Sequence, residues 1–231
     1  MNSFSLTANV VDVHARRVYP GTVTVRDAVI VGIEPADASP ATYLCPGFVD
    51  AHVHVESSML VPAEFARAVT IQGTVATVSD PHEIANVLGL EGVAYMQASA
   101  AKSPLTICFG APSCVPATTF ETAGDELGVE QVTRLLDDDT IGYLSEVMNY
   151  PGVLAGDETV LGKIRAAHAR GTEIEGDARG LRGDDALGYV AAGKSTDHEC
   201  SEYDEAAEKL AAGCQILIRE GSAARNFDAL F

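Results

Sequence analysis

GTVATVSD (residues 73–80) is a short run of β-branched and small residues, and the longer segment IANVLGLEGVAYMQASAAK (84–102) follows it. A second apolar run, LTICFGAPSC (105–114), comes next. Short apolar runs bounded by turn residues are typical of buried strands, whereas the segment between them is long enough to form a helix. The order strand, helix, strand predicts a βαβ unit whose two strands are parallel and buried.

The same alternation continues from Pro46 to the end of the 231-residue chain. We expect strands at 48–56, 73–80, 105–114, 141–149, 173–178, 194–199 and 214–221, with helices between them and the start of a further helix at 224–231. Seven such units predict an α/β fold, a (β/α)8-type barrel of which the eighth unit is missing. An unclosed barrel leaves strand edges unpaired. We therefore expect a homo-oligomer, or a longer protein of which this chain is the front part.

Residues 1–44 follow a different pattern, in which Val- and Thr-rich runs alternate apolar and polar residues and are interrupted at Pro20-Gly21 and Pro35. This period of two predicts a small antiparallel sheet with hairpins. The expected organisation is therefore a small β-sheet over 1–44 and an incomplete barrel over 45–231.

The composition excludes several classes of function. The chain carries 33 acidic and 15 basic residues, a formal net charge of -18, which disfavours binding to nucleic acid. Its five cysteines include no CxxC pair, which argues against a disulfide framework and a thiolate zinc site. Neither a signal peptide nor an apolar run of membrane-spanning length is evident, so we expect a cytoplasmic protein without a membrane partner.

Two histidines stand one residue apart in PGFVDAHVHVESSM (46–59). Residues i and i+2 of a strand face the same side, so His52 and His54 can reach one metal ion. Alone, such a pair is more often a packing or surface feature. Its place at the C-terminal end of the first barrel strand, where barrel enzymes carry their chemistry, favours a metal site.

Further ligand-type side chains end the later strands, namely Glu146, Asp177, His198 and Glu220. Imidazoles and carboxylates at one edge of a sheet suit one or two divalent transition metals. Such ions activate water for attack on an electrophilic carbon.

The loops after the second and third strands carry polar residues. Asp80 either caps the next helix or takes part in catalysis, and His82 and Glu83 are expected to line the pocket. Ser113 either holds a polar substrate or belongs to a structural turn. We assign Glu83, Ser113 and Glu220 to substrate binding.

Several motifs together, PGFVDAHVHVESSM, SDPHEIANVLGLEGV, APSCVPATTFETAG, MNYPGV, TDHEC and IREGSAARN, resemble the adenine deaminases of bacteria and archaea, which belong to the amidohydrolase superfamily. The resemblance covers 44–231, and it implies that the small N-terminal sheet is part of the family's composite β-sandwich domain. It implies hydrolysis of adenine to hypoxanthine and ammonia, with manganese or iron in a binuclear centre. It also implies that His52 and His54 are strand-one ligands, Glu146 the bridging carboxylate and His198 the strand-six ligand.

Two departures from that family pattern are visible. Residues 176–180 are Gly-Asp-Ala-Arg-Gly, where the family has a motif similar to Gly-His-Ala-Pro-Gly, so Asp177 stands in place of a ligand histidine. A carboxylate is a harder metal ligand than an imidazole. The family's strand-eight aspartate has no counterpart in this sequence.

Two alternatives remain beside adenine deamination. One is a related metallohydrolase that acts on another cyclic amide or amidine, and agreement beyond the metal ligands argues against it. The other is a non-catalytic, truncated or degenerate paralogue. Metal content separates the latter from an enzyme, because a degenerate site binds little metal.

Overall fold

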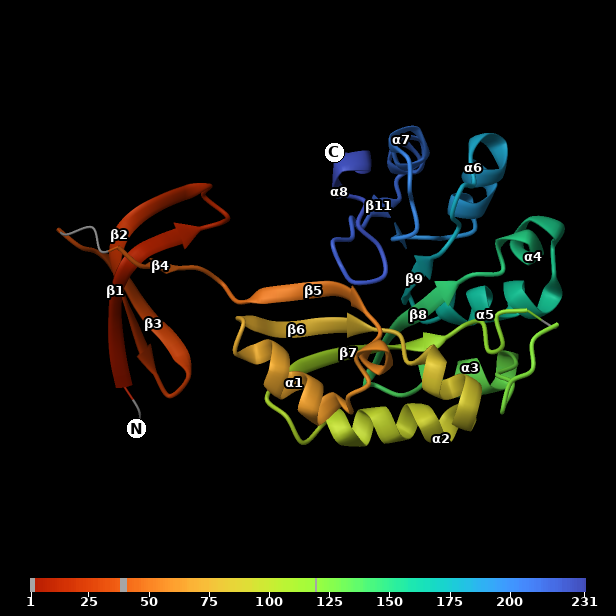
Figure 1. Cartoon of the computed structure of the whole chain (residues 1–231), viewed down its shortest axis with the longest axis horizontal. Coiled ribbons are helices and arrows are strands. Elements are labelled where there is room, and N and C mark those ends of the chain that lie inside the picture. Colours follow the sequence, from red (N-terminus) through yellow and green to blue (C-terminus); the bar gives the residue numbers. More distant parts are fainter. Residues whose placement is uncertain (1–2, 38–40, 119) are drawn as a thin grey trace. The chain divides into compact units, whose positions relative to one another are not determined.

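The computed structural model describes residues 3–37, 41–118 and 120–231. The chain divides into two compact units, Met1–Phe48 and Val49–Phe231 (Figure 1). Each unit is described here by itself.

The first unit is a four-stranded sheet in the order β3-β2-β1-β4. Its strands are β1 (Ser3–Asp12), β2 (Arg17–Arg26), β3 (Val29–Pro35) and β4 (Tyr43–Leu44). The first three pair antiparallel, as expected, whereas β4 pairs parallel with β1. The hairpin between β2 and β3 turns at Asp27 and Ala28, which both have positive φ, as a tight two-residue turn requires.

The predicted break at Pro20-Gly21 is wrong, because both residues lie inside β2. Gly21 opposite Pro35 is the last pair of the β2–β3 ladder, so Pro20 lies just beyond it. A residue without an N–H is tolerated at the end of a ladder. Pro35 does end β3.

The second unit is built on a seven-stranded sheet in which the strands follow one another in chain order. They are β5 (Phe48–Val53), β6 (Thr74–Ser79), β7 (Thr106–Pro112), β8 (Ile141–Val147), β9 (Glu173–Gly176), β10 (Thr196–Asp197) and β11 (Gln215–Ile216). The pairs from β6 to β11 are parallel. The predicted α/β fold with part of a (β/α) barrel is confirmed. β10 and β11 are shorter than expected, because the chain turns out of the ladder directly after Asp197 and Ile216.

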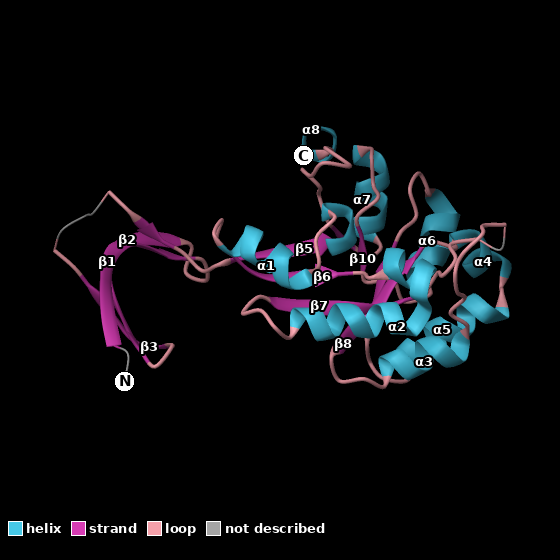
Figure 2. Cartoon of the chain, turned by 60° about the horizontal axis from the view of Figure 1, so that its bottom comes forward, coloured by secondary structure: helices cyan, strands magenta, loops and turns pink. Residues whose placement is uncertain are grey.

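Helices connect these strands (Figure 2). They are η1 (Val55–Ser58), α1 (Pro62–Thr70), α2 (His82–Ala100), α3 (Val129–Leu136), α4 (Tyr150–Ala155), α5 (Glu158–His168), α6 (Gly183–Ala191), α7 (Tyr203–Ala211) and α8 (Phe227–Leu230). The short helix α4 was not expected. It begins where the Asn149 side chain accepts a hydrogen bond from Gly152 N and ends at Gly156, which has φ 77°. None of the helices described is both long and apolar enough to cross a membrane.

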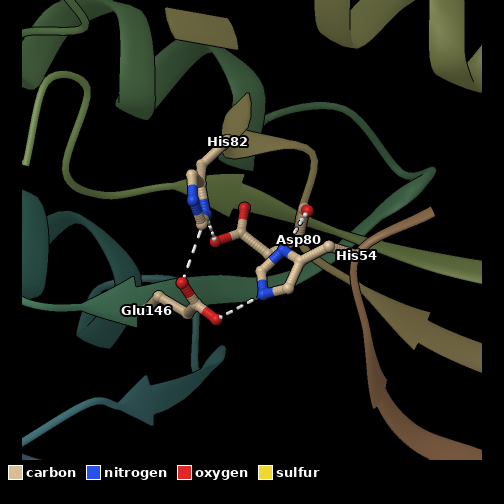
Figure 3. Close-up of side chains that lie close together, drawn as sticks. All are labelled: His54, Asp80, His82 and Glu146. Atoms are coloured by element: carbon tan, nitrogen blue, oxygen red, sulfur yellow. Dashed lines mark hydrogen bonds and ion pairs between the residues drawn. The ribbon is translucent and has the colours of Figure 1, made fainter. Parts of the chain in front are cut away.

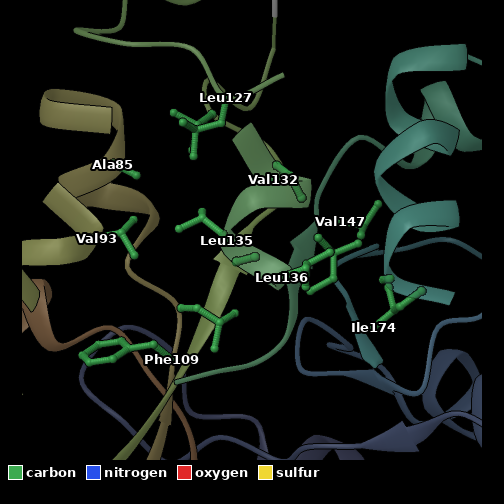
Figure 4. Packing of buried hydrophobic residues seen from close by; sticks show 14 of the residues in the cluster. Ala85, Val93, Phe109, Leu127, Val132, Leu135, Leu136, Val147 and Ile174 are labelled. Atoms are coloured by element: carbon green, nitrogen blue, oxygen red, sulfur yellow. The ribbon is translucent and has the colours of Figure 1, made fainter. Parts of the chain in front are cut away.

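The main apolar core lies between this sheet and its helices (Figure 4). Phe109 of β7 and Leu144 of β8 are buried against side chains such as Val93 of α2 and Val132 of α3. Each fully buried side chain of this size contributes about 1.5–3 kcal/mol. This packing holds the strands in register, so that their C-terminal ends meet along one edge.

Candidate metal centre

Three histidines from two distant parts of the chain converge on one carboxylate oxygen of Glu146, Oε1, and His82 contacts the other oxygen at 3.1 Å (Figure 3). The Nε2 atom of His54 is 2.9 Å from Glu146 Oε1, and those of His52 and His198 are 3.2 and 3.3 Å from the same oxygen. His52 lies in β5, His54 directly follows it, and His198 directly follows β10, while Glu146 lies in β8. The side chains of His52, His198 and Glu146 are almost entirely buried. The structure therefore brings together four of the five residues predicted as metal ligands.

Glu146 has an unusual backbone conformation. Its φ is 30°, which a residue other than glycine rarely adopts. The β8–β9 register shifts between Leu144 and Val147, so Glu146 lies in an irregular part of the ladder. The buried hydroxyl of Ser113 donates to the Glu146 carbonyl at 2.7 Å. Strained conformations of this kind persist where surrounding contacts hold them. Ser113, predicted from the sequence to bind substrate, supplies such a contact.

We expect Ser113→Ala to destabilise the fold by about 1 kcal/mol, the usual contribution of one buried hydrogen bond, and to weaken metal binding. The reason is that the Glu146 carbonyl would lose this buried donor and keep the bond from Met148 N. Thermal melts and Mn²⁺ titration measure the two effects. Ser103→Ala is the matched control, because the Ser103 hydroxyl also donates to a backbone carbonyl but lies in the turn after α2. Equal effects of both substitutions on metal affinity would contradict the positioning role of Ser113.

A second buried carboxylate, Glu175 of β9, supports two of the histidines. Its Oε1 atom is 2.7 Å from Nδ1 of His52 and 3.4 Å from Nδ1 of His198. A partner at Nδ1 fixes ring orientation and tautomer, which leaves Nε2 free to bind a metal. Sequence reasoning missed Glu175. The signal was its place in EIEGDA, where it alternates with Ile174 along a strand.

The carboxylates and imidazoles alter each other's pKa. Burial alone would lower the pKa of His52, but bonds to Glu146 and Glu175 outweigh it and raise that pKa to about 9. The same balance raises the pKa of His198 to about 10. Burial would raise the pKa of Glu146, but its bonds to the imidazoles hold it well below the ordinary value. The cluster therefore attracts positive charge, which protons or a metal ion can supply.

A divalent metal ion fits this donor set. With bonds of about 2.1 Å, neighbouring donor atoms on one ion lie about 3–3.5 Å apart, which is the spacing found around Glu146. In the described part of the chain, Asp80 Oδ1 and Glu175 Oε2 are buried and have no hydrogen-bond partner. Imidazole and carboxylate donors without thiolates suit divalent transition metals.

The remaining predicted residues lie around this cluster. Among the described residues, the two groups of donors close enough to share an ion do not include Asp177, so its role as a ligand stays a prediction. Burial and then repulsion by Glu146 raise the pKa of Asp177 to about 7. The Oε1 atom of Glu83 accepts from the Ser57 hydroxyl at 3.0 Å, and its Oε2 atom is 3.5 Å from His54 Nδ1.

Glu220 is exposed and lines a cavity of about 370 Å³ together with His52, His54 and Ser57. The Oε1 atom of Glu220 accepts a hydrogen bond from Phe227 N at 3.0 Å, which holds the carboxylate at the start of α8. The cavity is therefore lined both by Glu220, a predicted substrate-binding residue, and by two histidines of the candidate metal centre.

Comparison with known proteins agrees with this geometry. The chain is 60% identical over 228 residues to an adenine deaminase of Salinibacter ruber (99% of this chain, 42% of the relative) and 54% identical over 225 residues to one of Sulfurovum sp. (97% and 42%). It thus spans less than half the length of these curated relatives.

N-isopropylammelide isopropylaminohydrolase from Burkholderia multivorans shares the fold, with a TM-score of 0.56 and 14% identity, over 98% of this chain and 70% of that one. The model of the Amidohydrolase family matches residues 43–221. The family model matches most of the chain, which folds as a partial (β/α) barrel with a histidine–carboxylate cluster at its strand ends. The chain therefore belongs to the amidohydrolase family.

Proposed function

We propose that this chain forms the metal-binding part of a deaminase that converts adenine and water to hypoxanthine and ammonia, with manganese or iron in a binuclear centre. The observation that carries the proposal is the convergence of histidines on the buried carboxylate of Glu146. The relatives named adenine deaminase support adenine as the substrate.

Glu146 and Glu175 have separate parts in this reaction. Divalent ions, when bound, lower the pKa of water and make it nucleophilic at neutral pH. Glu146 stays ionised because its pKa is held low, so it keeps the charge that attracts the ions. Glu175 fixes the orientation of the His52 imidazole through its contact with Nδ1. The 370 Å³ cavity beside His54 is within the size range of small-molecule sites.

We propose that Glu83, predicted from the sequence to bind substrate, moves the proton. Its carboxylate is partly exposed, bonds the Ser57 hydroxyl and lies near His54 at the cavity. In this position it can take a proton from the attacking water and give it to the departing amino group. Such general acid–base catalysis contributes roughly 10²–10⁴-fold.

The test is release of ammonia and hypoxanthine from adenine by the 231-residue chain supplied with MnCl₂. Release by this chain would support the proposal, and we expect Glu83→Gln to lower it by about 100-fold or more with unchanged metal content. Glu91→Gln is the matched control, because Glu91 is exposed on the same helix. A metal-loaded chain that is inert toward adenine but opens a cyclic amide without releasing ammonia would favour the related hydrolase. Failure to bind metal would favour a degenerate paralogue.

A further inference from the structure

Another cavity of about 370 Å³ is lined by three arginines, Arg179, Arg219 and Arg225. Arg179 follows β9, and the other two follow β11. Among the described residues that line this cavity, Glu199 is the only carboxylate. In the chain as a whole, acidic residues outnumber basic ones by 33 to 15. An excess of arginine in one cavity of so acidic a chain indicates a negatively charged ligand.

The guanidinium groups of this cavity are largely without partners. Of the three, only Arg219 has an ion-pair partner among the described residues, Glu199, whose Oε1 atom is 2.6 Å from Nη1. The Nε atom of Arg219 is buried and has no hydrogen-bond partner in the described part of the chain. A buried N–H group without an acceptor costs free energy, which a ligand oxygen would recover. Arg179 and Arg225 are exposed, so a ligand that enters from solvent can reach them.

Hydrogen bonds hold the wall of the cavity around Arg219 in place. Arg219 N donates to Asn226 Oδ1 at 2.8 Å, and Asn226 N donates to the Arg219 carbonyl at 3.0 Å. The Nδ2 atom of the buried Asn226 donates to the Cys200 carbonyl at 2.7 Å. These bonds tie the segment after β11 to the segment after β10. A wall that is already ordered lowers the entropic cost of binding a ligand.

This cavity shares part of its wall with the cavity at the metal cluster. Arg219, Ala223 and Ala224 line both of them. Arg179 lies in residues 176–180, where the sequence departs from the deaminase pattern. The set of three arginines is therefore a feature of this chain and lies next to its candidate metal centre.

We propose that Arg179, Arg219 and Arg225 bind a phosphate group, either free phosphate or the phosphate of an ester. Guanidinium groups bind phosphate through paired N–H donors, and a phosphate has more acceptor oxygens than a carboxylate to share among three of them. The volume of the cavity is within the range of small-molecule sites, so it also admits a group attached to the phosphate. Binding needs neither the metal ions nor turnover of adenine.

The experiment is titration calorimetry of the full chain with sodium phosphate at constant ionic strength. It is run on the chain loaded with MnCl₂ and on the chain stripped with a chelator, because phosphate can also bind to metal ions. Arg179→Gln and Arg225→Gln each remove one positive charge from the cavity. Arg134→Gln is the matched control, because Arg134 is exposed on α3, has no ion-pair partner among the described residues and does not line this cavity.

We expect the stripped and the loaded chain to bind phosphate with the same affinity. Arg179→Gln and Arg225→Gln should each weaken binding by about tenfold, the usual effect of losing a hydrogen bond to a charged group. Arg134→Gln should bind as the unaltered chain does. Binding of phosphate only when metal is present, or equal affinities of Arg179→Gln and Arg134→Gln, would overturn the proposal.

Adenosine 5′-monophosphate is the second probe, and it separates the two sources of phosphate. Binding tighter than that of sodium phosphate, and weakened by Arg179→Gln, would assign the site to a phosphate ester. Binding no tighter than that of sodium phosphate would assign it to free phosphate. Neither titration depends on release of ammonia, so the phosphate site and the proposed deaminase reaction can fail separately.

Discussion

Replacing both His52 and His54 with alanine is expected to abolish tight binding of divalent metal. Both imidazoles place Nε2 within 3.2 Å of Glu146 Oε1. The variant therefore removes two of the imidazole donors around that carboxylate at once. Loss of an outer-shell partner alone costs about 10–100-fold in metal affinity, and loss of two ligands should exceed about 100-fold. Titration with Mn²⁺, followed by calorimetry or by paramagnetic resonance, measures this change.

The matched control replaces two other histidines, His14 and His168, with alanine. Both are exposed, and neither belongs to a donor group among the described residues. We expect this variant to bind metal as the unaltered chain does. If the His52 and His54 double variant kept its full metal content while folded, the site assignment would be wrong.

Replacing Lys209 with alanine is expected to destabilise the fold by about 3–5 kcal/mol, the usual cost of breaking a buried ion pair by removing one partner. The side chain of Lys209 is completely buried. Its Nζ atom donates to Asp197 Oδ2 and Glu205 Oε1, both at 2.9 Å, and to the Ala178 carbonyl at 2.6 Å. Without the ammonium, two buried carboxylates would face each other uncompensated.

The same ion pair also holds the backbone segments that follow β9 and β10, in which Asp177 and His198 lie. Glu205 accepts hydrogen bonds from Gly180 N, after β9, and from Ser201 N, after β10. The Lys209→Ala variant should therefore lose metal affinity as well as stability. Urea unfolding measures the loss of stability, and Lys102→Ala, at an exposed position after α2, should stay within about 0.5 kcal/mol. A loss below about 1 kcal/mol for Lys209→Ala would mean that the pair does not hold these loops.

The sequence alone was sufficient for the parallel sheet and for most of the histidine cluster. Alternation of short apolar runs with longer amphipathic segments has few solutions other than buried parallel strands covered by helices. In such a sheet the C-terminal ends of all strands lie along one edge, so the residues at these ends become neighbours. For that reason His52, His54, Glu146 and His198 could be grouped without any coordinates.

The tertiary structure alone decided how those residues are supported. Glu175 orients His52 across 123 positions of sequence, and Ser113 holds Glu146 across 33. Strand and helix periodicity specify which face a side chain shares with its near neighbours, but not which distant side chain it meets. His82 contacts the second carboxylate oxygen of Glu146 at 3.1 Å, and Glu146 has a positive φ, an irregularity that no periodic pattern contains. Local pattern thus determined the fold and the edge where the site lies, whereas long-range packing determined the pairing of its donors.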